Sequence, residues 1–446
     1  MRRCGGRVSP VQTPSPAMRR MQRIALTMLV ISGAVNYLDR SALAIGNPEI
    51  RKELGLDATQ MGVLLSAFLI SYAFAQLPTG LLVDRVGPRK LLGLGLTVWS
   101  LAQTLAGFVS TLSQLWWARL FLGIGEAPQF PSGARVVSDW FNVKDRGFPT
   151  GVFNSAASVG PALAPPILTA LMLAFGWRMM FITMGVLGLI TAVVWFAVYQ
   201  DPERRATAED RAYIRSGDTD QTAAVTLPQW ARLFRLRTTW GMVFGNFCVG
   251  YLAWIYFAWL PGYLEIQHHV SIAKTGVYAA IPPLLGVFGS LIGGYLSDRL
   301  AARGVTPLNS RKIPIIGGII GMAACTVLAA YSGGVISAMI FISAAIFFST
   351  ITSGAVWALV TAAAPPNYVA SIGSIQNFGG YLGGTCSPIL TGFIVDRTGS
   401  FVMALVLGAA ISLAGALIYL FAVTRPIGGA ELESASGSVV AGRLAE

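Results

Sequence analysis

Apolar segments of roughly twenty residues recur along almost the whole chain, separated by short polar connections. A helix needs roughly 20 apolar residues to cross the hydrocarbon core of a membrane. The segments cover residues 22–46, 60–82, 91–110, 114–137, 149–175, 177–199, 239–263, 275–297, 313–333, 335–360, 368–394 and 400–424. The pattern therefore predicts an all-α membrane protein with twelve transmembrane helices.

One long polar stretch divides the twelve predicted helices into two groups of six. We therefore expect two six-helix bundles joined by a cytoplasmic linker, with polar tails at both ends. The expected boundaries are a disordered tail at 1–21, the N-terminal bundle at 22–199, the linker at 200–238, the C-terminal bundle at 239–424 and a second tail at 425–446.

Short motifs recur at matching places in the two halves. Residues 80–85 (GLLVDR) end the second helix of the first half, and residues 294–299 (GYLSDR) end the second helix of the second half. Such internal repeats are typical of secondary transporters, which bind substrate near the middle of the membrane between the repeats. The two bundles are therefore expected to be pseudo-symmetric.

Composition favours a membrane protein over a soluble one. Only 12% of the residues are charged and 54% are hydrophobic, whereas an ordinary soluble domain has about 25% charged residues. So few polar side chains cannot cover the surface of a soluble enzyme of 446 residues. We expect the chain to lie in a lipid bilayer.

The positive charges are distributed unevenly between the two sides of the predicted helices. With the N-terminus in the cytoplasm, 25 of the 32 Lys and Arg residues fall on the cytoplasmic side, five on the other side and two within the membrane. Cytoplasmic loops carry such an excess, and it accounts for the net charge of +12 without a nucleic-acid partner. The distribution predicts an inner (plasma) membrane protein with both termini in the cytoplasm.

Residue types that bind metals or act as nucleophiles form no recognisable constellation. The four cysteines are far apart, and both histidines, His268 and His269, lie in a short connection. The sequence contains no HExxH or GxSxG motif and no Cys/His cluster with metal-binding spacing. We therefore do not expect an enzyme, a metal site or a cofactor.

Four charged residues lie deep within predicted membrane helices, all in the first half. They are Asp39 and Arg40 in the first helix, and Arg119 and Glu126 in the fourth. A charge at the centre of a bilayer costs at least ~2.5–3.5 kcal/mol, so charges retained there are functional candidates. Arg119 and Glu126 are about two helical turns apart and are expected to project from one face.

These four residues predict an anion site coupled to protons. An arginine fork matches a carboxylate, so Arg40 and Arg119 are expected to hold the carboxylate of the substrate. A buried carboxylate whose arginine partner is taken by substrate can accept a proton, which predicts proton coupling at Asp39 and Glu126. The alternative is that Asp39–Arg119 or Arg40–Glu126 are static ion pairs that hold the helices in register.

Helix-breaking and uncharged polar residues indicate a central cavity. Glycines and prolines interrupt the fourth predicted helix just after Glu126, and further prolines occur in the fifth. Broken helices are tolerated where they line protein or a water-filled cavity. Polar and aromatic side chains near the middle of the helices could contact a hydroxylated solute, although each one taken singly could instead serve packing. Those that we assign to substrate contact are Tyr37, Tyr72, Trp357 and Asn377.

The sequence resembles the major facilitator superfamily over residues 22–424. The cytoplasmic loop signature of that superfamily corresponds to residues 80–90, with Pro88 where a basic residue is common. Further motifs resemble the anion:cation symporter family within it: NYLDR at 36–40, RLFLGIGEAPQFP at 119–131, and QNFGG at 376–380.

This resemblance implies proton-coupled uptake of an organic anion by alternating access. Many substrates of the family are sugar acids such as hexonates, hexuronates and aldarates. The alternatives are uptake of an aromatic or other small carboxylate, and export by the same fold; a monomer is expected. The resemblance implies substrate contacts for Tyr37, Arg40, Tyr72, Arg119 and Asn377, and proton coupling for Asp39 and Glu126.

A cytoplasmic gate is expected where the repeated motif ends the second helix of each half. Acidic and basic side chains there can pair with neighbouring helices and close the cytoplasmic side when the protein faces outward. The expected gate residues are Asp84, Arg85, Arg89, Asp139, Arg146, Asp298 and Arg299.

Overall fold

The computed structural model describes residues 14–142, 145–215, 227–365 and 368–428. Within these ranges the chain is helical and contains no β-strand. The first half forms α1 Pro16–Leu54, α2 Ala58–Val86, α3 Pro88–Ala106, α4 Leu112–Glu126, α5 Gln129–Trp140 and α6 Gly147–Val198. The second half forms α10 Arg237–His268, α11 Ile272–Ala302, α12 Pro307–Ala330, α13 Val335–Ala363, α14 Val369–Thr398 and α15 Val402–Phe421.

These elements form the twelve predicted membrane segments. The 52-residue α6 contains two of them, because the backbone leaves the helical region at Gly176, with φ 79° and ψ 164°. Conversely, α4 and α5 together form the fourth, which breaks at Pro128 as the sequence predicted. Eight of the described helices are long and apolar enough to cross a membrane by themselves.

The prolines of the fifth predicted helix do not interrupt it, contrary to the expectation from the sequence. Pro161, Pro165 and Pro166 all lie inside α6. A membrane helix can keep its course through a proline when neighbouring groups satisfy the freed carbonyls.

The N-terminal helix begins earlier than the apolar run indicates. Its first residue is Pro16, and Ser15 caps it by accepting a hydrogen bond from the Met18 amide. The Ser15 amide and hydroxyl both donate to Asp210, at 3.1 and 2.9 Å, in the short helix α8 (Ala208–Arg215). Residues 16–21, expected in the polar tail, are therefore helical, and residues 1–13 lie outside the described ranges.

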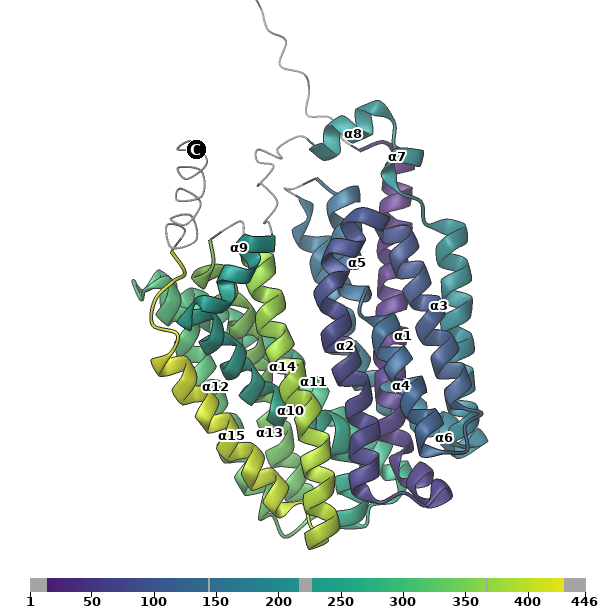
Figure 1. Ribbon diagram of the computed structural model, residues 1–446, viewed down its shortest axis with the longest axis vertical. Helices are drawn as coiled ribbons and strands as arrows, with labels where there is room; N and C mark the ends of the chain where they lie inside the picture. The colour runs from purple at the N-terminus through teal and green to yellow at the C-terminus, as the bar shows by residue number, and fades with distance from the viewer. Residues whose placement is uncertain (1–13, 143–144, 216–226, 366–367, 429–446) are drawn as a thin grey trace, which may run out of the picture.

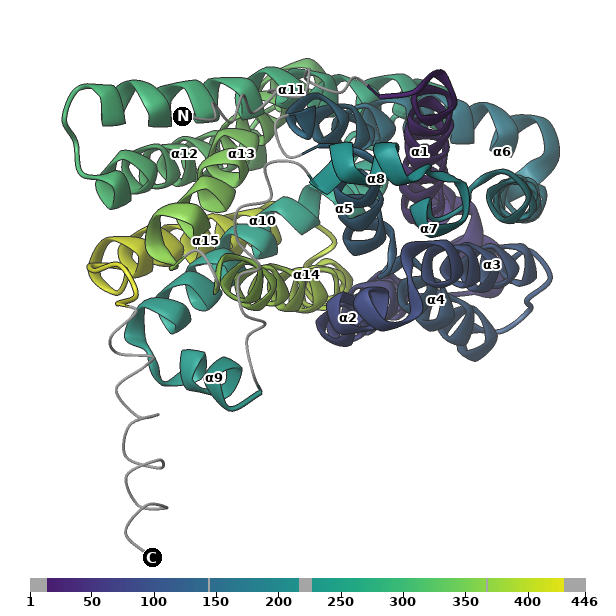
Figure 2. The ribbon, with the colours of Figure 1, turned by 90° about the horizontal axis from the view of Figure 1, so that it is seen from above.

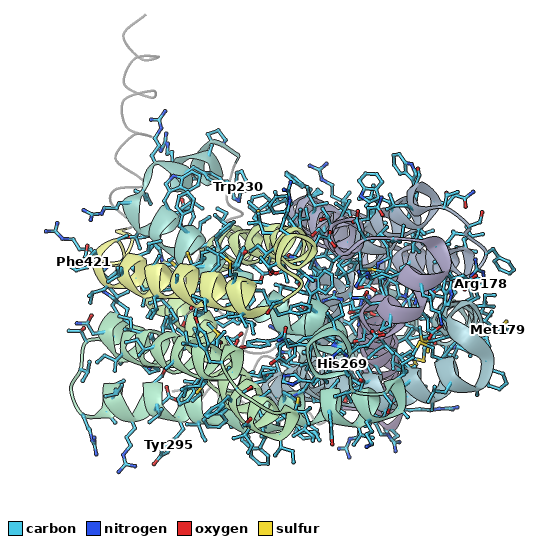
Figure 3. The ribbon with its side chains drawn as sticks, turned by 90° about the horizontal axis from the view of Figure 1, so that it is seen from below. Arg178, Met179, Trp230, His269, Tyr295 and Phe421 are labelled. Atoms are coloured by element: carbon cyan, nitrogen blue, oxygen red, sulfur yellow. The ribbon has the colours of Figure 1, made fainter. Side chains whose placement is uncertain are left out.

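The short helices of the linker lie at one end of the two bundles, which we call the linker end (Figure 1). They are α7 Pro202–Arg205, α8 Ala208–Arg215 and α9 Leu227–Arg232. Viewed from this end, α2 lies beside α14 (Figure 2). Helix α6 packs against α11, and α1 contacts α10. Large apolar side chains such as Met179, Tyr295 and Phe421 are exposed on the outer surface (Figure 3), as expected for a surface in contact with lipid.

The seam between α2 and α14 is tight at the end opposite the linker and separates toward the linker end. A methyl group added to Gly62 would lie 2.3 Å from the Pro388 carbonyl oxygen, and one added to Gly392 would lie 2.2 Å from the Ala58 carbonyl oxygen. Gly80 follows Gly62 by eighteen residues, or five turns, so both lie on one face of α2. A methyl group added to Gly80 would meet no atom within 4 Å.

The seam between α6 and α11 shows the same asymmetry. A methyl group added to Gly276 would lie 2.5 Å from the Thr169 hydroxyl oxygen. Gly151 and Gly294 lie eighteen residues away from Thr169 and Gly276, on the same helix faces, and a methyl group added to either would meet no atom within 4 Å. The bundles are therefore closed together opposite the linker and separated at the linker end.

Candidate functional site

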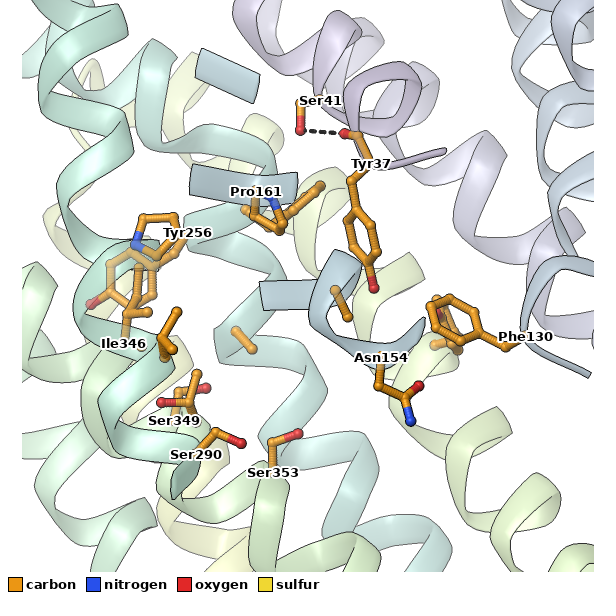
Figure 4. Close-up of a pocket in the computed structure, with 18 of the residues that line it drawn as sticks. Tyr37, Ser41, Phe130, Asn154, Pro161, Tyr256, Ser290, Ile346, Ser349 and Ser353 are labelled. Carbon is orange, nitrogen blue, oxygen red and sulfur yellow. Dashed lines mark hydrogen bonds between the residues drawn. The ribbon is translucent and has the colours of Figure 1, made fainter. Parts of the chain in front are cut away.

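A cavity of about 840 Å³ lies between the two bundles. Its wall includes residues of α1, α2, α5 and α6 on one side and of α10, α11, α13 and α14 on the other. Tyr37 and Asn154 lie on one side of it, and Ser290, Ser349 and Ser353 lie together on the other (Figure 4). The described residues that line it are all uncharged.

Behind the α1 side of this wall lies a buried ion pair. Arg40 Nε donates to Glu126 Oε2 at 2.6 Å, and the two side chains are 3% and 0% exposed. The sequence places Glu126 at the last residue of α4, where the glycines and Pro128 end the helix. The pair therefore joins α1 to the broken end of the fourth membrane segment, and it matches one of the two static pairs considered as the alternative.

Three aromatic rings surround the Arg40 guanidinium. Its Cζ atom lies 4.7 Å from the ring centre of Tyr72, 5.1 Å from that of Phe68 and 5.2 Å from that of Tyr37. Arginine above an aromatic face is stabilised by the ring quadrupole, and the attraction is largest where water is excluded. Because Tyr37 and Tyr72 also line the cavity, these two rings stand between Arg40 and the cavity.

The second pair considered from the sequence does not form between side chains. Arg119 Nη1 donates to the backbone carbonyl of Asp39 at 3.4 Å, and not to its carboxylate. Both carboxylate oxygens of Asp39 are buried without a hydrogen-bond partner in the described part of the chain, as are Arg40 Nη2, Arg119 Nε and Glu126 Oε1. Buried polar atoms are normally paired, so this cluster has unused capacity for a proton, a water or a ligand group.

The predicted substrate contacts fall into two groups. Tyr37, Tyr72, Trp357 and Asn377 line the cavity, and Asn377 Nδ2 donates across the bundles to Gln76 Oε1 at 3.0 Å. Arg40 and Arg119 are only 4% and 2% exposed and lie outside the lining.

Three features of the site were missed from the sequence. Phe68 lies beside both arginines, Tyr381 contacts Tyr72 with ring centres 4.6 Å apart, and serines line the C-terminal side. Tyr381 follows Asn377 by one helical turn, and that spacing could have identified it.

The predicted gate residues form contacts within their own bundles at the linker end. In the N-terminal bundle, Arg89 donates to the Phe196 carbonyl at 2.6 Å, and Asp139 forms an ion pair with Arg135 at 2.7 Å. Arg146 donates to the carbonyls of Ser138 and Phe141, at 2.9 and 3.1 Å. Asp298 pairs with Arg311 at 3.1 Å, Arg299 donates to the Tyr295 hydroxyl at 2.9 Å, and Arg85 is exposed. The Asp84 side chain lies outside the described part of the structure. The gate was expected to close in the outward-facing state, so it stays a prediction.

Known proteins share this fold and much of the sequence. The probable L-galactonate transporter of Escherichia coli strain K12 is 44% identical over 415 residues, covering 93% of this chain and 92% of that protein. The probable galactarate/D-glucarate transporter GarP of the same strain is 33% identical over 419 residues, covering 90% and 94%. A bacterial homologue of the human lysosomal transporter Spinster, solved inward-facing and unoccupied, matches with a TM-score of 0.77 at 18% identity, covering 92% of this chain and 98% of that one.

The family assignment agrees with the fold and with the resemblance found in the sequence. The model of the Major Facilitator Superfamily matches residues 29–388, which include the buried ion pair and all the described residues that line the cavity. The chain belongs to the Major Facilitator Superfamily and is a multi-pass membrane transporter, not an enzyme.

Proposed function

We propose that this transporter carries a sugar acid, a six-carbon hexonate in the first place, into the cell together with protons. The observation that carries the proposal is the 44% identity, over almost the whole chain, to a protein named as a probable L-galactonate transporter. The cavity wall supports it, because its described residues include no charged side chain and place uncharged hydroxyl and amide groups, such as those of Asn154, Ser349 and Asn377, among its apolar side chains. These groups can form hydrogen bonds with a hydroxylated solute.

The carboxylate of the substrate is proposed to bind the arginines behind the aromatic rings. Arg40 Nη2 and Arg119 Nε are donors without partners among the described residues, and arginine binds carboxylates through paired N–H groups. The substrate reaches Arg40 only when the Tyr37 and Tyr72 rings turn aside. Their movement therefore accompanies binding.

Proton coupling is proposed to follow from exchange of partners at Arg40. The sequence placed Glu126 on the same helix face as Arg119, but the ion pair of Glu126 is with Arg40. When the substrate carboxylate takes the Arg40 guanidinium, Glu126 loses its cation in a site that excludes water, and protonation neutralises it. Asp39, whose carboxylate has no hydrogen-bond partner among the described residues, is the second proton site.

The linker end is proposed to face the cytoplasm, with both termini on that side. Most of the Lys and Arg residues outside the membrane then lie in the cytoplasm, as they do in most membrane proteins. The two seams are separated at this end, so we assign the conformation to the inward-facing state. Alternating access requires the seams opposite the linker to open and those at the linker end to close.

The test is uptake into proteoliposomes that contain the purified protein. We expect uptake of radiolabelled L-galactonate, stimulated by an inward proton gradient and abolished by an uncoupler. Galactarate, a hexuronate and benzoate serve as competitors, to separate hexonates from the dicarboxylate, the uronate and the aromatic alternative. Uptake of no sugar acid in either direction would refute the proposal, and net movement only from inside to outside would make the protein an exporter.

A further inference from the structure

Three serines on the C-terminal side of the cavity have free hydroxyl groups. Serine in a membrane helix usually donates to a carbonyl three or four residues earlier, as Ser41, Ser71 and Ser374 do here. Ser290, Ser349 and Ser353 make no such bond, nor any other hydrogen bond within the described part of the chain. We call these three residues the serine cluster.

The serine cluster is brought together by two helices. Ser349 and Ser353 are one turn apart on α13 and therefore lie on one face. Ser290 comes from α11, and its hydroxyl oxygen lies 3.7 Å from the place of a methyl group on Gly354, next to Ser353. All three line the cavity, where Figure 4 shows them side by side.

Ser349 is the strongest indication of a ligand. The residue is only 9% exposed, and its hydroxyl group lines the cavity without a partner among the described residues. The next hydroxyl residue along α13, Thr350, satisfies itself by donating to the Phe347 carbonyl at 2.9 Å. A hydroxyl that a bound ligand covers and leaves unpaired costs about 1–3 kcal/mol, so a ligand that forms a hydrogen bond with Ser349 binds better than one that only covers it.

The chemistry of the serine cluster suits hydroxyl groups better than a carboxylate. A serine hydroxyl both donates and accepts, and so does each hydroxyl of a polyol, whereas a carboxylate only accepts and is bound best by cations. All four deep charges belong to α1 and α4, in the N-terminal bundle. The two walls of the cavity therefore offer different chemistry to the two parts of a sugar acid, its carboxylate and its chain of hydroxyl groups.

We infer that the serine cluster binds the hydroxyl groups of the polyol chain, while the N-terminal bundle binds the carboxylate. This inference rests on the proposed function and names the part of the site that selects hydroxylated acids. An acid without hydroxyls leaves the three serines desolvated and unpaired, and sites built to pair with a substrate hydroxyl reject analogues that lack it.

The test combines serine variants with deoxy substrates. Ser290→Ala, Ser349→Ala and Ser353→Ala each remove one oxygen, and inhibition of labelled L-galactonate uptake gives the affinity for the full sugar acid and for its 4-, 5- and 6-deoxy analogues. We expect each variant to lose about fivefold in affinity for the full sugar acid. For the analogue that lacks the contacted hydroxyl, variant and wild type should bind equally, as in a double-mutant cycle.

Thr361→Val is the matched control. Thr361 lies on the same helix and donates to the Ala358 carbonyl at 2.8 Å, away from the cavity lining. Equal losses for every analogue, or no loss for any serine variant, would overturn the inference while sugar-acid uptake by the wild type stands. If the wild type takes up no sugar acid, the proposed function fails first.

Discussion

Removal of the Asp396 carboxylate should open the seam on the side opposite the linker. Asp396, near the end of α14, accepts hydrogen bonds from the Ala58 amide at 2.9 Å and from the Thr59 amide at 2.6 Å, and the Thr59 hydroxyl donates to it as well. One carboxylate of the C-terminal bundle thus binds the first turn of α2. This contact must break before the protein can face the other side.

The contact is separate from the folding of α2, because that helix has its own cap. Asp57 accepts from the Gln60 amide at 2.7 Å, and the Gln60 side chain accepts from the Asp57 amide at 3.1 Å. Hydrogen bonds to a charged group contribute about 1.5–3 kcal/mol each where water is excluded. Asp396 is exposed and Thr59 is half-buried, so the freed groups regain water. We therefore assign roughly 1.5 kcal/mol to the contact as a whole, about a tenfold shift in the equilibrium.

The assay is thiol labelling at the other seam. In a variant without native cysteines, Thr169→Cys places a thiol where α6 meets Gly276 of α11, and Thr169 is 4% exposed. Asp396→Asn should raise its labelling rate about tenfold with a membrane-impermeant reagent added on the side opposite the linker. Asp57→Asn removes the same charge from the same helix end without touching α14 and should leave the rate unchanged. Equal effects of the two variants, or none, would refute the reasoning.

Three further predictions concern the charged residues. Glu126→Gln should abolish accumulation of substrate driven by a proton gradient yet retain counterflow, because exchange needs no net proton movement; accumulation that persists would exclude Glu126 as the coupling site. Arg119→Lys should weaken substrate binding about tenfold or more, since an ammonium cannot form the paired contacts of a guanidinium, and titration by tryptophan fluorescence measures it. Burial raises the pKa of Asp210, but hydrogen bonds from Ser15 and Thr207 outweigh it and hold that pKa below its usual value. The hydrogen bonds between Ser15 and Asp210 should therefore be complete at neutral pH and weaken as the pH falls through that low pKa. At pH 7 the hydrogen-exchange rate of the Ser15 amide should be slower in the wild type than in Asp210→Asn, and in acid the two rates should become equal.

The twelve membrane segments and the deep charges were predictable because both follow from local free energies. Twenty apolar residues are stable across a bilayer as a helix whatever surrounds them, and a charge within such a run is costly enough to mark a site by itself. The break after Glu126 was equally visible, since Pro128 follows two nearby glycines. The two halves were separable because the linker is too polar to enter the membrane.

The sequence offered Arg40–Glu126 and Asp39–Arg119 as possible ion pairs, but it could not decide which of them forms, because that depends on how the helices are rotated against one another. The spacing on α4 placed Arg119 and Glu126 on one face, but it could not tell that Glu126 meets Arg40 while Arg119 meets only the Asp39 carbonyl. The serine cluster was missed for a related reason. A serine hydroxyl can donate to a carbonyl of its own helix or point into a cavity, depending on its rotamer. The pattern of residues along the sequence does not reveal that rotamer.

The position of Tyr72 links the charged cluster to the motion of the bundles. Asp39, Arg40, Arg119 and Glu126 all belong to the N-terminal bundle, so they move with it as the seams open and close. The Tyr72 ring lies 4.7 Å from the Arg40 guanidinium on one side and 4.6 Å from the ring of Tyr381, in α14, on the other. Turning the Tyr72 ring aside to admit a carboxylate therefore also changes a contact between the bundles. If a carboxylate binds Arg40 as proposed, occupation of the arginine and the relative position of the bundles are expected to be coupled through the Tyr72 side chain.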